Sequence, residues 1–389
     1  MILTYRFRMY PKKEEEQKLI WTLNKCRFVY NKLLEELNRQ EKISKNDLQH
    51  SIVELKKEFP ELKDVYSKVL QYENHKLFSN LRALAKTKKN GRKVGKLRFK
   101  SKNSFKTFTY NQTGFRIIEK QTRSVELHLS KIGRILTIKH RTIKGKIKQI
   151  TIKRYPSQKW YALVAVENKM EVPRKQNTRR VGIDLGIINY VYDSDGNHFD
   201  NPKSLDNSLK KLKKRQKRLS MKKKESKNWF KQKIEVARVH EKIVNQRDDF
   251  LHKLSNYYTK NYRFIAVENL DVRGLIRLSY SARNIVDASW SKFTLMLHYK
   301  AERAGCVFLK VDPEGTTQTC SSCGKKIKKQ LWERIHMCGC GLEIDRDHNS
   351  AINILKRALG QELPEFTPAE TGPLPARASS VNETGSSLQ

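Results

Sequence analysis

Two sets of residues in this chain have types and spacings that could bind metal ions. The first is a pair of cysteine motifs, Cys320-Ser-Ser-Cys323 and Cys338-Gly-Cys340, with fourteen residues between them. Four thiolates can complete the tetrahedral coordination of Zn²⁺ and leave no open position, which is typical of a structural site. Because the C-x-C half is tighter than the usual C-x-x-C, His336 is an alternative ligand for one cysteine. The spacing predicts one structural zinc ion.

The second set consists of three carboxylates. Asp184 and Glu268 each end a short apolar stretch that predicts a buried strand, and Asp347 begins the last predicted helix. A single acid in such a place is more often a cap or a turn residue. Acids brought together at strand ends repel one another, so their site is stable when divalent cations fill it.

Two such cations about 4 Å apart can hold a scissile phosphate and activate water. The set therefore predicts a site for two Mg²⁺ ions, or for Mn²⁺, and a phosphodiester substrate. From the residues alone, Asp345 and Asp347 are equivalent candidates for the third ligand.

The charge of the chain points to the same class of partner. Lys and Arg number 81 against 40 Asp and Glu, which gives a net charge of +41. Self-repulsion on this scale is typical of a protein whose partner is a polyanion. A simple gain in solubility is the alternative explanation, and it accounts poorly for the clustering of the charge.

One basic segment, residues 86–110, interleaves cations with aromatic rings, as a nucleic-acid surface requires. An amphipathic strand with a basic outer face is the alternative. The candidate nucleic-acid contacts are Lys96, Arg98, Phe99, Lys100, Lys102 and Lys106, and the rings of Phe105, Phe108 and Tyr110 follow the same alternation.

Composition also bounds the compartment. The chain has no apolar run of about 18 residues, so no membrane span is expected. Four of the six cysteines are paired locally, and Cys26 and Cys306 fit apolar patterns typical of core residues, so a disulfide framework is not expected. These features favour a reducing cytoplasm.

The elements that must position these residues fall into two halves. Alternating apolar residues predict a strand at 1–10 and further short strands over 115–167, and helical periodicity fills 11–88. We expect a small antiparallel β-barrel formed by 1–10 and 89–180, with the helices of 11–88 as an insertion.

The second half predicts an α/β sheet, so the fold class is a multidomain combination of α+β and α/β parts. The sheet is expected from 181–204, 261–315 and 341–360, interrupted by a basic helical arm at 205–260, with a break near 220–227, and by a zinc finger at 316–340. The Pro-, Glu-, Thr- and Ser-rich tail, 361–389, is expected to be disordered.

With these residues in place, the chain resembles the OrfB/TnpB family of transposon-encoded RNA-guided endonucleases, which are related to compact type V CRISPR effectors. The resemblance covers nearly the whole chain. It is carried by GKLRFKSK (95–102), GIDLGI (182–187), VENL (267–270), TTQTCSSCG (316–324) and CGLEIDRDHNSAINI (340–354).

The resemblance implies a wedge barrel with a helical recognition insertion, followed by an RNase H-like RuvC nuclease domain. It implies that Asp184, Glu268 and Asp347 are the catalytic acids, since the second aspartate of the D-R-D motif is the ligand in the family. It also implies that the zinc ligands are Cys320, Cys323, Cys338 and Cys340.

The implied function is RNA-guided, Mg²⁺-dependent cleavage of double-stranded DNA beside a short target-adjacent motif. The implied partners are a guide RNA encoded by the transposon, target DNA and a separate transposase of the same element, in a prokaryotic cytoplasm close to the nucleoid and without a membrane. Two other functions stay open: RNA-guided DNA binding without cleavage, and nonspecific nucleic-acid binding by an accessory protein.

Overall fold

The computed structural model describes residues 2–40, 44–119, 124–168, 177–278, 281–330 and 332–360. The expected disordered tail, 361–389, lies outside the described residues. The chain divides near residue 170 into two units. Each unit has its own sheet and its own core, so each is described by itself.

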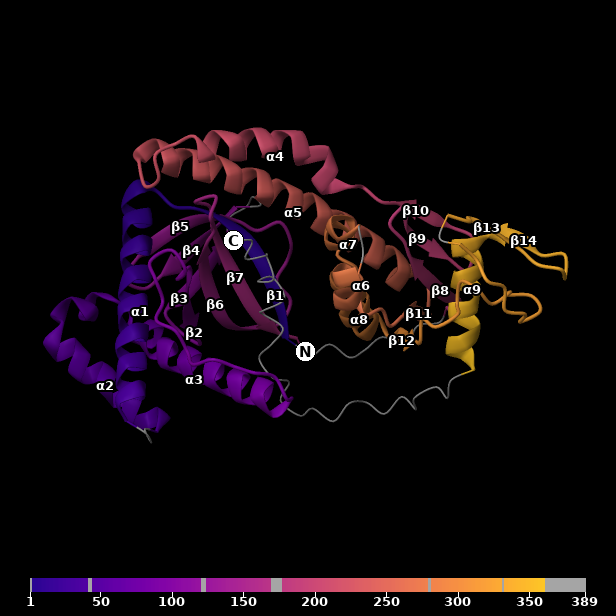
Figure 1. Ribbon diagram of the computed structural model, residues 1–389. Helices are drawn as coiled ribbons and strands as arrows, with labels where there is room; N and C mark the ends of the chain where they lie inside the picture. Colours follow the sequence, from indigo (N-terminus) through magenta and orange to yellow (C-terminus); the bar gives the residue numbers. More distant parts are fainter. Residues whose placement is uncertain are drawn as a thin grey trace. The chain divides into compact units, whose positions relative to one another are not determined.

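The first unit is built on one seven-stranded antiparallel sheet with the order β2-β6-β7-β1-β5-β4-β3. Its strands are β1 (Ile2–Tyr10), β2 (Thr107–Asn111), β3 (Phe115–Glu119), β4 (Ser124–Leu129), β5 (Gly133–Ile138), β6 (Lys146–Arg154) and β7 (Trp160–Glu167). The first strand is central and pairs with both β5 and β7. Figure 1 shows the sheet curled, which agrees with the predicted antiparallel architecture.

The helices between β1 and β2 lie where the sequence predicts them: α1 (Lys13–Arg39), α2 (Lys45–Glu58) and α3 (Ser67–Lys89). Pro60 begins a separate 3₁₀ turn, Pro60–Asp64, because proline fits the first turn of a helix but cannot continue the one before it. The apolar faces of the helices pack on the sheet, with Tyr30, Leu33 and Leu77 fully buried in the shared core.

The second unit holds a five-stranded sheet with the order β10-β9-β8-β11-β12. Its strands are β8 (Arg180–Leu185), β9 (Asn189–Asp193), β10 (His198–Asp200), β11 (Phe264–Glu268) and β12 (Val307–Val311). The pairs β10/β9 and β9/β8 are antiparallel, whereas β8, β11 and β12 run parallel. The predicted α/β sheet is therefore present, with an antiparallel half.

The remaining elements of this unit are α4 (Ser204–Ser220), α5 (Lys227–Asn261), α6 (Val272–Leu278), α7 (Ala282–Ala288), α8 (Trp290–Ala304), the hairpin β13 (Ile335–Met337) and β14 (Glu343–Asp345), and α9 (Arg346–Leu359). Helices α4 and α5 form the predicted two-helix arm, closed by Leu212, Val239 and Ile243. Its break at 221–226 ends at Ser226, whose hydroxyl accepts the N–H of Trp229 and caps α5.

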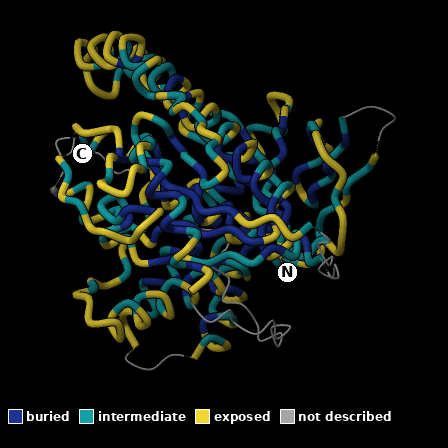
Figure 2. Tube along the Cα trace, turned by 90° about the vertical axis from the view of Figure 1, so that its right-hand side faces the viewer, coloured by how far each residue is buried: buried dark blue, intermediate teal, exposed yellow. Residues whose placement is uncertain are grey.

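The core follows the strands and the inward faces of the helices, and the connecting loops are exposed (Figure 2). None of the described helices is long and apolar enough to cross a membrane.

Three of the rings assigned to a nucleic-acid surface belong instead to the core of the first unit. Phe105, Phe108 and Tyr110 are 6%, 0% and 1% exposed. The hydroxyl of Tyr110 donates to the carbonyl of Ser130 at 2.8 Å. The expectation that they stack on bases is wrong. Phe108 and Tyr110 share the face of β2 that packs on the helices α1 and α3, and Phe105, just before β2, packs beside Tyr30 of α1.

Candidate active site and metal centre

The alternation of side chains along β8 and β11 places Asp184 and Glu268 on the same face of the sheet. In β8, Val181, Ile183 and Leu185 belong to the core that α5 and α8 cover. The intervening Gly182 and Asp184 therefore face the other side, which α9 covers. In β11, the residues Phe264 and Ala266 pack on the α9 side, and Glu268 follows the same alternation.

The register brings these two acids to neighbouring positions. The strands β8 and β11 are parallel, with Ile183 opposite Val267, so the next residues of the two strands are Asp184 and Glu268. Both lie at carboxyl ends of strands, which is where sites form in open α/β sheets.

Helix α9 supplies the third acid. It approaches β8 so closely that a Cβ on Gly182 would lie 2.2 Å from the carbonyl oxygen of Ala351, so only glycine fits there. A Cβ on Gly186, just beyond β8, would lie 3.9 Å from the Oδ2 atom of Asp347. The first turn of α9 therefore directs Asp347 toward the end of the strand that carries Asp184.

The two candidate aspartates of α9 have different surroundings. Asp345 is the N-cap: its carboxylate accepts the backbone N–H of Asp347 at 2.7 Å and that of His348 at 3.3 Å. Asp347 is buried, and its carboxylate contacts arginine side chains. This division of roles supports Asp347 as the ligand.

All three acids are shielded from solvent, with 8%, 8% and 9% of Asp184, Glu268 and Asp347 exposed. Burial raises the pKa of Asp184 well above its ordinary value, and the charges of Glu268 and Asp347 raise it further. Burial also raises the pKa of Glu268, against a hydrogen bond from Thr316 and the charge of Arg357. A divalent cation would relieve this repulsion, so the residues fit hard-metal ligation.

Arginines neutralise part of this charge. A guanidinium nitrogen of Arg346 lies 3.3 Å from the Oδ1 atom of Asp347, and one of Arg334 lies 3.7 Å from its Oδ2 atom. Among the residues that the structure describes, the three carboxylates do not gather within 4.8 Å of one another, in contrast to the thiols described next.

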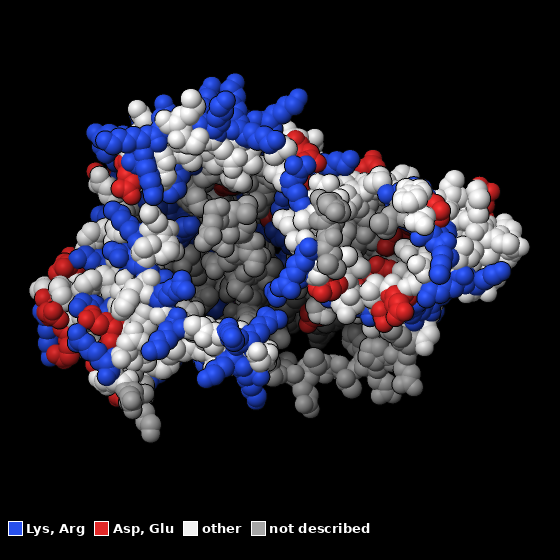
Figure 3. All heavy atoms as spheres, in the orientation of Figure 1, with Lys and Arg blue, Asp and Glu red and all other residues white. Residues whose placement is uncertain are grey.

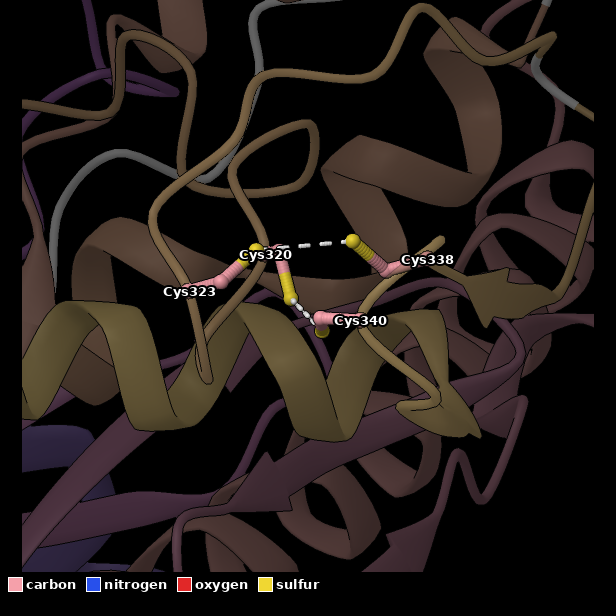
Figure 4. Close-up of side chains that lie close together, drawn as sticks. All are labelled: Cys320, Cys323, Cys338 and Cys340. Atoms are coloured by element: carbon pink, nitrogen blue, oxygen red, sulfur yellow. Dashed lines mark hydrogen bonds between the residues drawn. The ribbon is translucent and has the colours of Figure 1, made fainter.

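The four predicted zinc ligands converge. The Sγ atoms of Cys320, Cys323, Cys338 and Cys340 all lie within 4.8 Å of one another and point toward a common centre (Figure 4). The Sγ–Sγ distances are 3.7 Å between Cys320 and Cys340 and 3.5 Å between Cys323 and Cys338. A tetrahedron with Zn–S bonds of about 2.3 Å has sulfur atoms about 3.8 Å apart, so the cluster fits zinc.

The thiols of the cluster shift one another's pKa in opposite directions. Burial alone would raise the pKa of Cys320, but the backbone N–H groups of Cys323 and Ser322, together with His336 and Cys338, lower it to about 5. Against a backbone hydrogen bond from Cys340, burial and the neighbouring thiols raise the pKa of Cys338 to about 12. His336 is fully buried on β13 and is not one of the four converging ligands. The four sulfurs satisfy the site without it.

Residues that the sequence did not single out join the loop that carries these cysteines to α9. The amide nitrogen of Asn349 donates to the carbonyl of Thr319 at 2.8 Å, and its oxygen accepts the N–H of Ser321 at 2.8 Å. One turn later, the amide of Asn353 donates to the carbonyls of Thr316 and Thr319 at 2.9 and 2.6 Å. In the sequence, the signal for this contact is the spacing of two polar residues four positions apart on a buried helix face.

The predicted nucleic-acid segment is an irregular connection between α3 and β2 in the first unit. Lys96, Arg98, Phe99, Lys102 and Lys106 are exposed, and Lys100 is half-buried. Its backbone is fixed at Lys100, whose N–H and carbonyl bond the side chain of Asn31 at 2.8 and 3.0 Å. The cations are therefore presented on a held loop, and the 58% exposed ring of Phe99 lies among them.

Family models match three parts of the chain. A model described as “Probable transposase” (OrfB_IS605) matches residues 163–279, and one described as “Cas12f1-like, TNB domain” matches 290–354. A third, described as a helix-turn-helix domain, matches residues 1–45, where the structure has β1 and the single long helix α1.

A relative from Streptomyces pristinaespiralis, named “Putative RNA-guided DNA endonuclease”, is 33% identical over 371 residues, which cover 91% of this chain and 89% of the relative. The chain belongs to the OrfB/TnpB family. Another OrfB/TnpB relative, InsQ of Escherichia coli (strain K12), has the same descriptive name and is 29% identical over 377 residues, covering 90% of this chain and 91% of InsQ.

The fold of this OrfB/TnpB protein also occurs in a compact CRISPR effector. The chain aligns with the protein of a Cas12f1–sgRNA–target DNA complex at a TM-score of 0.59, with 15% identity, over 88% of this chain and 83% of that one. At this identity the likeness concerns the fold alone.

Proposed function

We propose that this protein is an RNA-guided DNA endonuclease that hydrolyses phosphodiester bonds at Asp184, Glu268 and Asp347. The observation that carries the proposal is the convergence of three buried acids on one face of the second sheet, at the ends of β8 and β11 and the start of α9. The names of the two relatives point to the same activity.

The three carboxylates would hold Mg²⁺, as a pair of ions, or Mn²⁺. Bound in such a site, these ions supply an activated water and stabilise charge on the phosphate. Water attacks phosphorus opposite the 3′ oxygen, and the bond to that oxygen breaks, which leaves 3′-hydroxyl and 5′-phosphate ends. The chain itself contributes burial, which excludes bulk water and raises the pKa of Asp184, and Arg346, whose positive charge opposes that rise and which pairs with Asp347.

The four thiolates would hold one structural Zn²⁺ outside the chemistry, because a closed tetrahedron has no position for substrate. The order of the second sheet, with three antiparallel strands followed by two parallel ones, supports an RNase H-like nuclease core formed by 181–204, 261–315 and 341–360. The curled first sheet and its helices would be the wedge barrel and the recognition insertion, with 205–260 as a basic arm and 316–340 as the zinc finger.

The partners would be a guide RNA encoded by the transposon and double-stranded DNA that matches the guide. The solved complex with the related fold is named for a single-guide RNA and target DNA, which supports both. The net charge of +41 suits two polyanions. In this scheme base pairing selects the target, and the protein reads a short motif beside it.

The decisive experiment combines RNA identity with cleavage. Sequencing of RNA that co-purifies with the protein should give one uniform species, and the complex should cut a guide-matched duplex in Mg²⁺. Replacing Asp184 with alanine (Asp184→Ala) should reduce cleavage by at least about 10³-fold while RNA binding persists. Asp249→Ala, at an exposed acid on α5, is the matched control.

Each alternative has its own outcome. Uniform RNA and guided DNA binding without cleavage by the wild type would identify a regulator. RNA of mixed sequence would identify a nonspecific accessory protein. Full cleavage by Asp184→Ala would show that the acids are assigned wrongly.

A further inference from the structure

A threonine from the zinc-bearing loop contacts one of the buried acids. The hydroxyl of Thr316 lies 2.5 Å from the Oε1 atom of Glu268, and Thr316 is 1% exposed. The hydroxyl oxygen of Thr316 also lies 3.1 Å from the carbonyl oxygen of Pro313. The closer and more strongly accepting partner is the carboxylate, so the hydroxyl donates to Glu268.

Thr316 is not free to follow movements of Glu268, because its backbone is held independently. The amide of Asn353 on α9 bonds the carbonyls of Thr316 and Thr319, and Asn349 bonds Thr319 and Ser321. The turn that begins at Gly315 (φ +74°) is therefore bound to the helix that carries Asp347. Cys320, the first zinc ligand, follows directly.

Glutamate needs such support more than aspartate does. Its longer side chain has more rotatable bonds, and a metal ligand must be held to within a fraction of an ångström to bind well. Fixing Oε1 sets the plane of the carboxylate and therefore the direction of Oε2. Hydrogen-bonded partners of metal-ligating groups commonly change metal affinity by 10–100-fold when they are lost.

We propose that Thr316 is a positioning residue that aims the Glu268 carboxylate at its divalent cation, and that the zinc-bearing loop serves the nuclease site in this way. The inference rests on the proposed function, since it takes Glu268 as a cation ligand. The cysteine cluster then has a second role, because it shapes the loop from which one hydroxyl reaches the active site.

The test compares three variants. Thr316→Val keeps the shape and removes the hydroxyl, Thr316→Ser keeps the hydroxyl, and Thr317→Val makes the same change at the neighbouring, half-buried threonine. Mn²⁺ binding to the nucleic-acid-free protein is measured by electron paramagnetic resonance. The Mg²⁺ concentration needed for half-maximal cleavage is measured on the RNA complex.

Thr316→Val should weaken Mn²⁺ binding about 10-fold or more and raise the Mg²⁺ requirement to a similar extent, with cleavage recovered at high Mg²⁺. Thr316→Ser and Thr317→Val should behave as the wild type. Zinc content checks that the loop has folded, and Thr316→Ala takes the place of the valine variant if that one loses zinc.

If Thr316→Val binds Mn²⁺ as tightly as the wild type does, the inference is wrong. It is also wrong if Thr316→Ser binds Mn²⁺ as weakly as Thr316→Val. The variant Glu268→Gln distinguishes a failure of this inference from a failure of the proposed function. If Glu268→Gln is inactive and Thr316→Val is normal, only the inference fails. If Glu268→Gln cleaves normally, the assignment of the acids fails with it.

Discussion

At the scale of single residues, the two units contain buried acids with opposite surroundings. Asp184 is buried against two further carboxylates, and both burial and those charges raise its pKa. Glu73, on α3 of the first unit, is fully buried and accepts two hydrogen bonds from the ammonium group of Lys76, at 3.0 and 2.9 Å. Burial alone therefore does not mark a cation site. The difference is the balance of neighbouring charges: Lys76 opposes burial at Glu73, whereas at Asp184 two carboxylates act with burial and only Arg346 opposes it.

The Glu73 carboxylate makes a testable prediction about pH. Burial raises its pKa from 4.5 to about 7, although Lys76 opposes the shift. The folded state therefore binds more protons than the unfolded state between these values, so stability falls as pH rises from about 4.5 to 7 and then levels off. At about 1.4 kcal/mol per pKa unit, the loss is on the order of 3 kcal/mol.

Glu73→Gln removes this titration and keeps an acceptor for Lys76. Its free energy of unfolding relative to wild type should therefore increase with pH across the same interval, apart from a constant offset. Chemical denaturation at a series of pH values measures the difference, with the exposed Glu54→Gln as control. If the free energy of unfolding changed with pH in the same way for wild type and Glu73→Gln, the raised pKa of Glu73 would be contradicted.

At the scale of elements, the loop after β12 is joined to α9 by Asn349 and Asn353, whereas the hairpin β13/β14 has little apolar packing beside the cysteine cluster. Trp332, Ile335 and Met337 are exposed, and only a short ladder joins β13 to β14. A segment with so small a core needs a metal to fold. We therefore expect one zinc per chain, bound by all four cysteines.

Cys323→Ser should lower the zinc content well below one per chain and speed amide hydrogen exchange across 316–345, while the strands β8 and β11 keep their protection. Metal analysis and hydrogen exchange by mass spectrometry measure the two effects. Ser322→Ala, at the exposed neighbour, is the control. Full zinc content in the Cys323→Ser protein would show that three thiols and another ligand suffice.

The sequence predicts those features of the fold and the site that are set by residues close together in the chain. The strands that carry Asp184 and Glu268, and the helix that begins beside Asp347, follow from apolar runs and a capping pattern within a few residues. The choice between Asp345 and Asp347 came from the family resemblance. The structure adds that Asp345 caps its own helix, whereas Asp347 is buried beside β8; its role as a ligand stays a prediction.

Other features depend on contacts between distant residues. The alternation at 99–110 did not predict which rings are buried, because only Thr107–Asn111 is a strand: Phe105, Phe108 and Tyr110 lie in the core, and Phe99 is exposed. Thr316 has no local signal for its role, because its partner, Glu268, lies 48 residues away. Closure of the first sheet into a barrel stays a prediction, since only the pairing of its edge strands could decide it.

At the scale of the whole molecule, the excess of 41 positive charges is the dominant property. Some of the 81 lysines and arginines pair with acids of their own helix, as Lys57 does with Glu54 and Lys253 with Asp249. The 40 acids cannot match all 81 cations, and lysine and arginine side chains gather over the α4–α5 arm (Figure 3). Cations without an acidic partner can bind the phosphates of a nucleic acid and release the counterions condensed on it, so they set how steeply affinity depends on salt.

We predict that the exposed cations of the loop at residues 96–106 bind phosphates of the guide RNA. Each lysine or arginine that contacts a phosphate contributes about 0.7 to 0.9 to the slope of log Kd against log salt. Replacing four exposed cations of the 96–106 loop with alanine should reduce that slope by about 3. The four are Lys96, Arg98, Lys102 and Lys106.

The matched control removes four cations that already pair with acids on their own helices: Arg39, Lys57, Arg238 and Lys253. It makes the same change in net charge, so the two variants differ only in where the charge lies. If the loop binds phosphates, its variant loses slope and the control keeps nearly all of it. Phe99→Ala should lower affinity without changing the slope, because stacking on a base releases no counterions. Equal slopes in the two four-residue variants would mean that the loop contributes only to the general field of the protein, and the RNA contacts would then have to lie elsewhere.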